Sequence, residues 1–233
     1  MKLSVIIPYY NEAKTIDTIL RRVYDVKLPD GLEREVIIVD DCSTDKGLEK
    51  IDRGAFKNLD VIKHPKNMGK GAALRSGIQR ASGDIILVQD ADLEYDPQDY
   101  PKLLQPILSG NADVVFGSRF VTGSCRRVHL FRHYLGNKVL TFVSNLFSNY
   151  DLSDMETGYK VFKASVIKGI KIRENRFGFE PEITQKIAKK KVRLYEVGIS
   201  YYGRDFDEGK KIRPVKDGLW ALVCTIRYGL GLG

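Results

Sequence analysis

The regular exchange of short apolar runs with segments of helical spacing constrains the fold of this chain more than any other feature. The runs are rich in β-branched residues and apolar almost throughout, which is typical of strands in a parallel sheet covered on both faces. Their alternation with helices predicts an α/β fold, with a mostly parallel central sheet flanked by helices. The predicted strands cover 3–8, 35–40, 60–64, 84–89 and 113–118, and the predicted helices cover 12–25, 44–52, 70–81 and 97–109.

The second half of the chain is less regular, but it contains no repeat, low-complexity segment or Pro/Ser-rich linker. A length of 233 residues suits one large domain, so we expect a single domain over 1–233. The expected elements are an amphipathic helix over 130–148, a strand over 157–163, a helix over 180–191, a strand pair or bent strand over 192–203, and a last helix over 217–228.

The net positive charge of the chain indicates which kinds of molecule it can bind. A net charge of +8 favours an anionic partner such as a phosphorylated ligand, a nucleic acid or an anionic membrane surface, although a Lys-rich solvated surface gives the same balance. The cysteines Cys42, Cys125 and Cys224 lie far apart without a CxxC pair, so neither a zinc site nor a disulfide framework is indicated. We therefore expect a reducing, cytoplasmic environment.

Two apolar segments bear on targeting. The opening "MKLSVIIPYYNE" reaches a proline after five apolar or small residues, which is too short for a signal-peptide core. The longest uncharged apolar stretch, "GLWALVCTI" at 218–226, is less than half of the roughly 20 residues that span a membrane. We expect a soluble protein, or one attached peripherally to the cytoplasmic face of the membrane.

Polar residues follow most of the predicted strands. Ligands of open α/β sheets bind beyond the carboxyl ends of the strands, so these tails are the expected place for a site. The chain has no GxGxxG after its first strand and no GxxxxGK[ST], which argues against a dinucleotide site and an NTPase phosphate loop. The tails read "PYYNE" (8–12), "DDCSTD" (40–45), "HPKNMGKGAAL" (64–74), "DADLEYD" (90–96) and "GSRF" (117–120).

The acidic tail after the fourth strand predicts a metal site. Asp90 and Asp92 offer two hard carboxylate ligands, which suit Mg²⁺ or Mn²⁺ completed by substrate phosphates and water. Asp96 before Pro97 is typical of a helix N-cap, and we expect Glu94 to be a solvated loop residue. The alternative for Asp90 and Asp92 is ordinary turn chemistry.

The tail after the second strand has a related chemistry. Asp40 or Asp41 can accept hydrogen bonds from a nucleobase N–H or from ribose hydroxyls. Ser43, Thr44 and Asp45 can instead do no more than cap the helix that follows.

A basic segment follows the fifth strand. Guanidinium groups bind phosphate in a bidentate manner, so the segment is a candidate phosphate site, with Arg119 first and Arg132 second. Its aromatic residues fall at helical spacing and not on a stacking platform, which argues against nucleic acid. A solvated basic surface is the alternative. The segment contains Arg119, Arg126, Arg127, His129, Arg132, His133 and Lys138.

Five motifs in order now carry a family resemblance: "SVIIPYYNEAKTI", "VIIVDDCSTD", "NMGKGAALRSGIQRASGDIILVQDADLEYDP", "ADVVFGSRF" and "DMETGYKVFK". They resemble the inverting family 2 glycosyltransferases of GT-A fold, and within them the branch of polyprenyl (dolichyl) phosphate mannose and glucose synthases. "FGFEPEI" and "EVGISYYGRDFDEGKKI" extend the likeness over nearly the whole chain. Many members of that branch carry C-terminal transmembrane helices, and we expect none in this sequence, so the lipid acceptor stays open.

The resemblance implies a nucleotide-diphospho-sugar donor of the GDP-mannose or UDP-glucose type and a divalent metal at the DxD motif. It also implies a donor-binding half over 1–120 and an acceptor-binding half over 121–233. Arg119 matches an arginine that handles phosphate. Donor-binding positions that match are Pro8, Tyr10, Glu12, Asp40, Asp41, Lys70, Gly71, Asp90, Ala91 and Asp92, with the metal at Asp90 and Asp92.

The acceptor decides the mechanism. A sugar hydroxyl needs a general base as it attacks, whereas a phosphate monoester is already anionic and needs none. The candidate bases are Asp154, Glu156 and Glu180, although Asp154 and Glu156 can equally orient cationic partners. We expect a polyprenyl phosphate acceptor. The alternatives are a saccharide acceptor in cell-surface polysaccharide assembly and a nucleotide-sugar-binding module without turnover.

The segment "GRDFDEGKKIRP" (203–214) has the alternating charge of a loop that orders over a bound ligand. Arg204, Lys210 and Lys211 can neutralise a leaving diphosphate, or the segment can be a surface loop without function. The last helix, around Trp220, is apolar nearly all round and is expected to be buried or to lie at a membrane surface.

Overall fold

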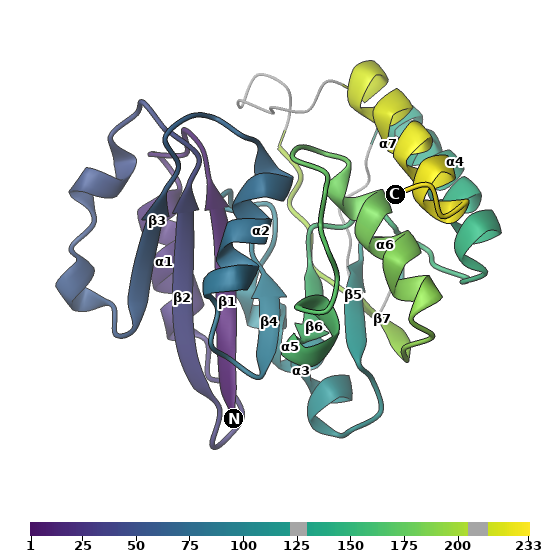
Figure 1. The fold of residues 1–233 in the computed structure, drawn as a ribbon. Coiled ribbons are helices and arrows are strands. Elements are labelled where there is room, and N and C mark those ends of the chain that lie inside the picture. The colour runs from purple at the N-terminus through teal and green to yellow at the C-terminus, as the bar shows by residue number, and fades with distance from the viewer. Residues whose placement is uncertain (122–129, 205–213) are drawn as a thin grey trace.

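A seven-stranded sheet forms the centre of the computed structural model, which describes residues 1–121, 130–204 and 214–233 (Figure 1). The strands lie in the order β3-β2-β1-β4-β6-β5-β7. β6 is antiparallel to both its neighbours, and the other pairs are parallel, as predicted. The strands are β1 (Lys2–Tyr9), β2 (Glu33–Asp40), β3 (Leu59–Lys63), β4 (Ile85–Val88), β5 (Val114–Ser118), β6 (Lys160–Lys163) and β7 (Leu194–Gly198).

Helices cover both faces of the sheet, so each central strand is buried on two sides. On one face α1 (Ile16–Asp25) and α3 (Tyr100–Leu108) pack against the strands. On the other face lie α2 (Lys70–Arg80), α5 (Ala164–Ile167) and α6 (Phe179–Lys189). Two apolar layers therefore enclose the sheet, which explains why its strands read as continuous apolar runs.

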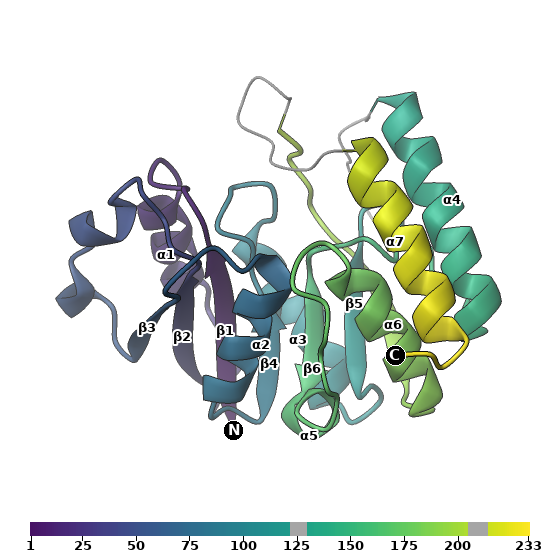
Figure 2. The ribbon, with the colours of Figure 1, turned by 45° about the horizontal axis from the view of Figure 1, so that its top comes forward.

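Two further helices stand beside α6, away from the sheet. α7 (Pro214–Gly229) packs against α6 and against α4 (Phe131–Ser148), and Figure 2 shows α4 and α7 side by side. The side of α7 that carries Ala221 and Cys224 is buried. No helix in the described ranges is both long and apolar enough to span a membrane.

Two segments differ from the sequence prediction. The helix expected over 44–52 is replaced by the 3-10 turns Gly47–Lys50 and Arg53–Ala55, because Lys46 adopts a left-handed conformation (φ 55°) and stops a regular helix. The region expected as a strand pair or bent strand forms the single strand β7, followed by an isolated bridge between Tyr95 and Tyr201.

The pairing register of the parallel strands places their carboxyl ends at one edge of the sheet. Tyr9 at the end of β1 pairs with Asp40 at the end of β2, while Ile6 pairs with Val88 at the end of β4. The tails that follow these strands therefore start from the same edge. This alignment builds the site described next.

Candidate active site

A cleft of about 740 Å³ opens at this edge of the sheet. Residues from the tails of β1, β2, β4 and β5 all line it, together with parts of the second half of the chain. This is the place where open α/β sheets bind their ligands. The sequence-predicted residues that line the cleft are Pro8, Tyr10, Glu12, Asp41, Lys70, Asp90, Ala91, Asp92, Arg119, Glu156, Glu180 and Arg204.

Two cations from distant parts of the chain hold the DxD carboxylates. Lys70 Nζ lies 2.8 Å from Asp90 Oδ1, and Arg204 Nη2 lies 2.8 Å from Asp92 Oδ2. Arg204 also contacts Glu12 Oε2 at 3.2 Å. These contacts relieve the repulsion expected where carboxylates crowd together.

The remaining negative charge suits a divalent cation. Burial, with Asp90 and Glu94 close by, raises the pKa of Asp92 to about 7. Among the described residues, no three His, Cys, Asp or Glu side chains form a ready-made metal cage. Mg²⁺ is usually held by only one or two carboxylates, with phosphate oxygens and waters as the other ligands. The donor set of Asp90 and Asp92 therefore fits a metal that arrives with a diphosphate.

Glu94 is not the solvated loop residue that the sequence suggested. It is buried and accepts hydrogen bonds from the Tyr201 hydroxyl at 2.7 Å and the Arg204 backbone N–H at 2.8 Å. Glu94 thus fixes the segment that carries Arg204 beside the DxD motif. The N-cap prediction for Asp96 is confirmed, because its side chain accepts from Gln98 N–H at the start of a 3-10 turn.

Asp41 organises the loop that leads to Lys70. Its carboxylate accepts the backbone N–H groups of Met68 and Gly69 at 2.8 and 2.6 Å, and His64 Nδ1 lies 2.8 Å away. Asp40 binds the Ser43 N–H at 2.8 Å and lies outside the residues that line the cleft. Asp41 therefore lines the cleft and Asp40 does not, a difference that their spacing in the sequence could not reveal.

Gly71 has a packing reason to be glycine. A side chain there would collide with the backbone carbonyl of Glu174, and the residue does not line the cleft. Close approach of α2 to the segment before α6 depends on this position. That approach brings Lys70 to within 3.3 Å of Glu180.

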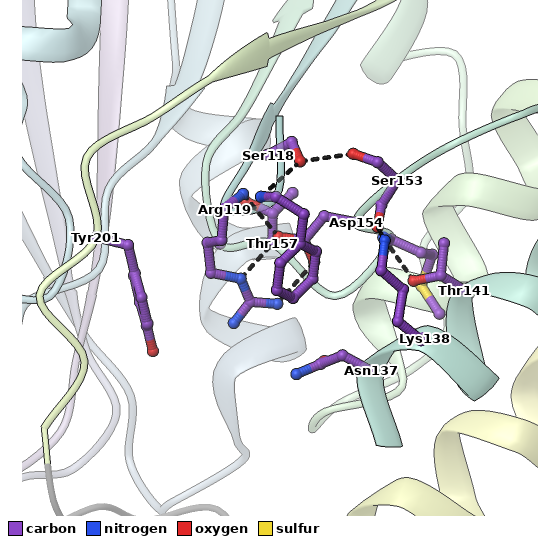
Figure 3. A network of polar contacts seen from close by, with 12 residues as sticks. Ser118, Arg119, Asn137, Lys138, Thr141, Ser153, Asp154, Thr157 and Tyr201 are labelled. Atoms are coloured by element: carbon purple, nitrogen blue, oxygen red, sulfur yellow. Dashed lines mark hydrogen bonds and ion pairs between the residues drawn. The ribbon is translucent and has the colours of Figure 1, made fainter. Parts of the chain in front are cut away.

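Arg119 is held in a fixed orientation by Asp154 (Figure 3). Its Nε and Nη2 both lie 2.7 Å from the Asp154 carboxylate, a bidentate pair, and its backbone N–H donates to the same group. The guanidinium also lies over the Tyr201 ring at 5.2 Å. Because Arg119 lines the cleft, the pair presents a preorganised positive charge there.

Asp154 itself is poorly placed to accept a proton. It is completely buried and does not line the cleft. Burial alone would raise its pKa, but Arg119 overcomes that effect and lowers the pKa below the ordinary value. The backbone N–H groups of Ser153 and Asp154 donate to Glu196, which anchors the loop. The geometry assigns Asp154 to orienting Arg119.

Several candidate residues lie elsewhere. Arg132 is exposed on α4 and does not line the cleft. Lys210, Lys211, Arg126, Arg127 and His129 lie outside the described residues. The cleft also contains residues that the sequence analysis did not single out. Asn67 and Tyr95 belong to strand tails that it did name, whereas Arg176, Phe177, Tyr201 and Lys216 come from segments far along the chain.

Comparison with known proteins gives relatives over most of the chain. The dolichol-phosphate mannosyltransferase of Pyrococcus furiosus is 32% identical over 213 residues, which are 90% of this chain and 59% of that protein. The undecaprenyl-phosphate mannosyltransferase of Micrococcus luteus is 28% identical over 99% of this chain and 95% of its own length. The chain thus spans less than two thirds of the Pyrococcus relative.

Solved structures share the fold. Glucosyl-3-phosphoglycerate synthase from Mycobacterium tuberculosis, in complex with Mn²⁺, UDP and phosphoglyceric acid, superposes with a TM-score of 0.75 at 18% identity, covering 98% of this chain and 78% of that one. The likeness confirms the predicted GT-A fold. The model of the family described as "Glycosyl transferase family 2" matches residues 4–170. The chain therefore belongs to glycosyl transferase family 2.

Proposed function

We propose that this protein transfers a hexose, with inversion, from a nucleotide-diphospho-sugar to a polyprenyl phosphate. One observation carries the proposal: a single cleft joins the DxD carboxylates to the preorganised Arg119. The Pyrococcus and Micrococcus relatives are named as mannosyltransferases of dolichol phosphate and undecaprenyl phosphate, which supports this choice of acceptor.

The donor would bind along the tails of the first half of the chain, 1–120. Pro8, Tyr10 and Asp41 line the part of the cleft proposed for the nucleoside. Asp90 and Asp92 would hold Mg²⁺ or Mn²⁺, which would neutralise the diphosphate as it leaves. The mycobacterial structure that contains Mn²⁺ and UDP supports metal use.

Lys70 and Arg204 would change partners when the donor binds. Each is a long cationic side chain that contacts a DxD carboxylate at 2.8 Å. A bound metal would take over those carboxylates, and both cations would then face the diphosphate charge. Positive groups placed where charge develops stabilise the transition state.

The acceptor phosphate would bind Arg119, which follows β5 directly and lies where the halves 1–120 and 121–233 meet. A phosphate monoester needs no deprotonation, and Asp154 is fully occupied with Arg119. This occupation favours a lipid phosphate over a saccharide hydroxyl. The saccharide reading would need Glu156 or Glu180 as the base.

The exposed faces of α4 and α7 support peripheral contact with a bilayer. The helices are neighbours, and Phe131, Phe142 and Leu146 on α4 are exposed to 71%, 63% and 67%. Leu219, Trp220, Val223 and Ile226 form a similar exposed row on α7. The apolar stripe of α4 therefore points outward, while Thr141 and Ser144 face inward.

The position of this surface relative to the cleft suits a lipid substrate. Lys216 in the first turn of α7 lines the cleft, so the apolar rows start beside it. Exposed Arg132 and Arg227 add positive charge to the same helices, which favours an anionic bilayer. Phe142→Glu should abolish cosedimentation with phosphatidylglycerol vesicles. Unchanged vesicle binding would remove the membrane from the proposal and leave the donor site standing.

The transfer itself is the direct test. The protein should move labelled hexose from GDP-mannose or UDP-glucose to undecaprenyl phosphate in the presence of Mn²⁺, giving an extractable glycolipid. Product on a saccharide acceptor alone would establish the alternative enzyme. Metal-dependent donor binding without hydrolysis or transfer to either acceptor would indicate a binding module.

A further inference from the structure

Two carboxyl groups in the cleft have an oxygen without a hydrogen bond. Glu156 Oε1 and Glu180 Oε2 are both buried, and neither has a partner among the described residues. Both side chains line the cleft. A buried polar atom left unpaired destabilises the fold, and such atoms are rare in folded proteins. Two of them in one cleft indicate groups that a ligand completes.

Their position in the cleft is fixed at both ends. Asp154 at one end of the segment 154–158 binds Arg119. Gly158 at the other end lies against Asp90, because a side chain there would collide with the Asp90 carboxylate. Glu156 is halfway between, and Glu180 contacts Lys70, which in turn contacts Asp90. The pair therefore lies between the donor carboxylates and the arginine proposed for the acceptor.

The segment is rigid enough to present Glu156 in one place. Lys160 is buried beneath it, and its Nζ donates to the backbone carbonyls of Met155 and Thr157. Glu180 is held from the other side as the second residue of α6. Both carboxyl groups are thus positioned by elements of the core.

We infer that Glu156 and Glu180 bind hydroxyl groups of the sugar that is transferred. The inference rests on the proposed function, since the sugar must lie between the donor diphosphate and the acceptor phosphate. Carboxyl oxygens accept hydrogen bonds from hydroxyls and repel phosphates, so of the donor's parts the sugar matches them. These two residues then help to decide which hexose the enzyme accepts.

The electrostatics of the pair agree with this role. Burial and the neighbouring Glu180 charge raise the pKa of Glu156 to about 8. A protonated Glu156 offers the sugar a hydrogen-bond donor as well as an acceptor. A carboxyl group that already carries its proton does not serve as a general base, so this assignment also separates Glu156 from that role.

The test compares two ligands on the same variants. Binding of UDP-glucose and UDP, and of GDP-mannose and GDP, is measured by calorimetry with Mn²⁺ for the wild type, Glu156→Ala and Glu180→Gln. Each variant should weaken the nucleotide sugar about tenfold, the usual cost of one such hydrogen bond, and leave the nucleoside diphosphate unchanged. Glu49→Gln, an exposed glutamate outside the cleft, is the matched control and should change neither.

A donor analogue sharpens the result. For a nucleotide sugar that lacks the contacted hydroxyl, the variants should cost nothing further, because the hydrogen bond is already gone. Equal weakening of nucleotide sugar and nucleoside diphosphate would overturn the inference, since the residues would then act through Lys70 and the metal site. Unchanged binding of both ligands would also overturn it. If the wild type binds no nucleoside diphosphate with Mn²⁺, the proposed function itself fails.

Discussion

The cleft contains two ion-pair systems of opposite construction. Asp90 and Asp92 each meet one long cationic side chain, Lys70 or Arg204, that comes from a distant part of the chain. Asp154 instead accepts two hydrogen bonds of 2.7 Å from the Arg119 guanidinium and is completely buried. In the proposed function, the first system would exchange its cations for a metal and a diphosphate. The Arg119–Asp154 pair would keep its geometry when the substrates bind.

The difference would let one cleft treat the two proposed phosphorylated substrates differently. A donor that leaves as a diphosphate needs charge that can rearrange around it, whereas an acceptor phosphate needs a charge already in place. Bidentate Arg–carboxylate pairs supply such fixed positive charge because their fork geometry is rigid. The predictions below test whether the two systems differ in this way.

The largest effect should come from breaking the fixed pair. Asp154→Asn leaves the buried Arg119 guanidinium without its counter-charge, so the free energy of unfolding in urea should fall by about 3–5 kcal/mol. Asp113→Asn is the matched control, because Asp113 pairs with Arg193 and Lys163 near the surface. That variant should cost less than about 1 kcal/mol. A similar loss in the free energy of unfolding for the two variants would mean that the buried Arg119–Asp154 pair stabilises the fold no more than the pairs of Asp113 near the surface.

Removing the arginine should separate acceptor from donor chemistry. Arg119→Ala should lower sugar transfer to undecaprenyl phosphate by about 10²–10³-fold, the usual cost of losing a preorganised charge. Slow hydrolysis of the donor should change much less, because that reaction uses the DxD side. Arg193→Ala, outside the cleft, serves as the control. A mild effect, together with loss of transfer in Glu156→Gln or Glu180→Gln, would instead indicate a hydroxyl acceptor.

The loop that supports Lys70 should give a smaller effect. Asp41→Ala removes the acceptor for two backbone N–H groups before α2, so nucleoside diphosphate binding should weaken by about 1–3 kcal/mol. Asp40→Ala, outside the cleft lining, should weaken it less. Calorimetry with Mn²⁺ measures both. Unchanged affinity in both variants would place the nucleoside elsewhere.

The smallest effect concerns a carboxylate at the opposite edge of the sheet. Glu35 accepts from Lys2 and from the Ser82 N–H and hydroxyl. Burial alone would raise its pKa, but these partners lower it from 4.5 to about 2. Its stabilisation is therefore complete above pH 4.5 and is lost as the pH falls toward 2.

Glu35→Gln should reduce the free energy of unfolding by about 1–2 kcal/mol at pH 7 and by clearly less at pH 3. Urea unfolding of both proteins at the two pH values isolates this residue from other groups that titrate. The same difference at both pH values would contradict the assigned pKa.

The first half of the fold was predictable because its strands are short, apolar and parallel. β1, β2, β3, β4 and β5 begin and end within two residues of their predicted limits. The position of β6 between β4 and β5 was not predictable, since strand order depends on contacts between distant segments. The short helix α5 was not predicted either, because four residues are too few to show helical periodicity.

The candidate site was also predictable only in part. The tails after the strands indicated Asp90, Asp92 and Arg119, because ligand chemistry collects at strand ends in this class of fold. The sequence did not reveal which residues pair with them: Arg204 reaches Asp92 across 112 residues. Glu94 was misjudged because its burial depends on Tyr201, which no local pattern connects to it.

The exchange of cations at the DxD motif is the central claim, and one titration tests it. UDP and GDP are titrated by calorimetry into the wild type, Asp90→Asn and Asp92→Asn, each with and without Mn²⁺. The wild type should bind one nucleotide in a metal-dependent manner, and both variants should lose that binding while unfolding in urea much as the wild type does. Tight metal-dependent binding that survives in both variants would contradict the assignment.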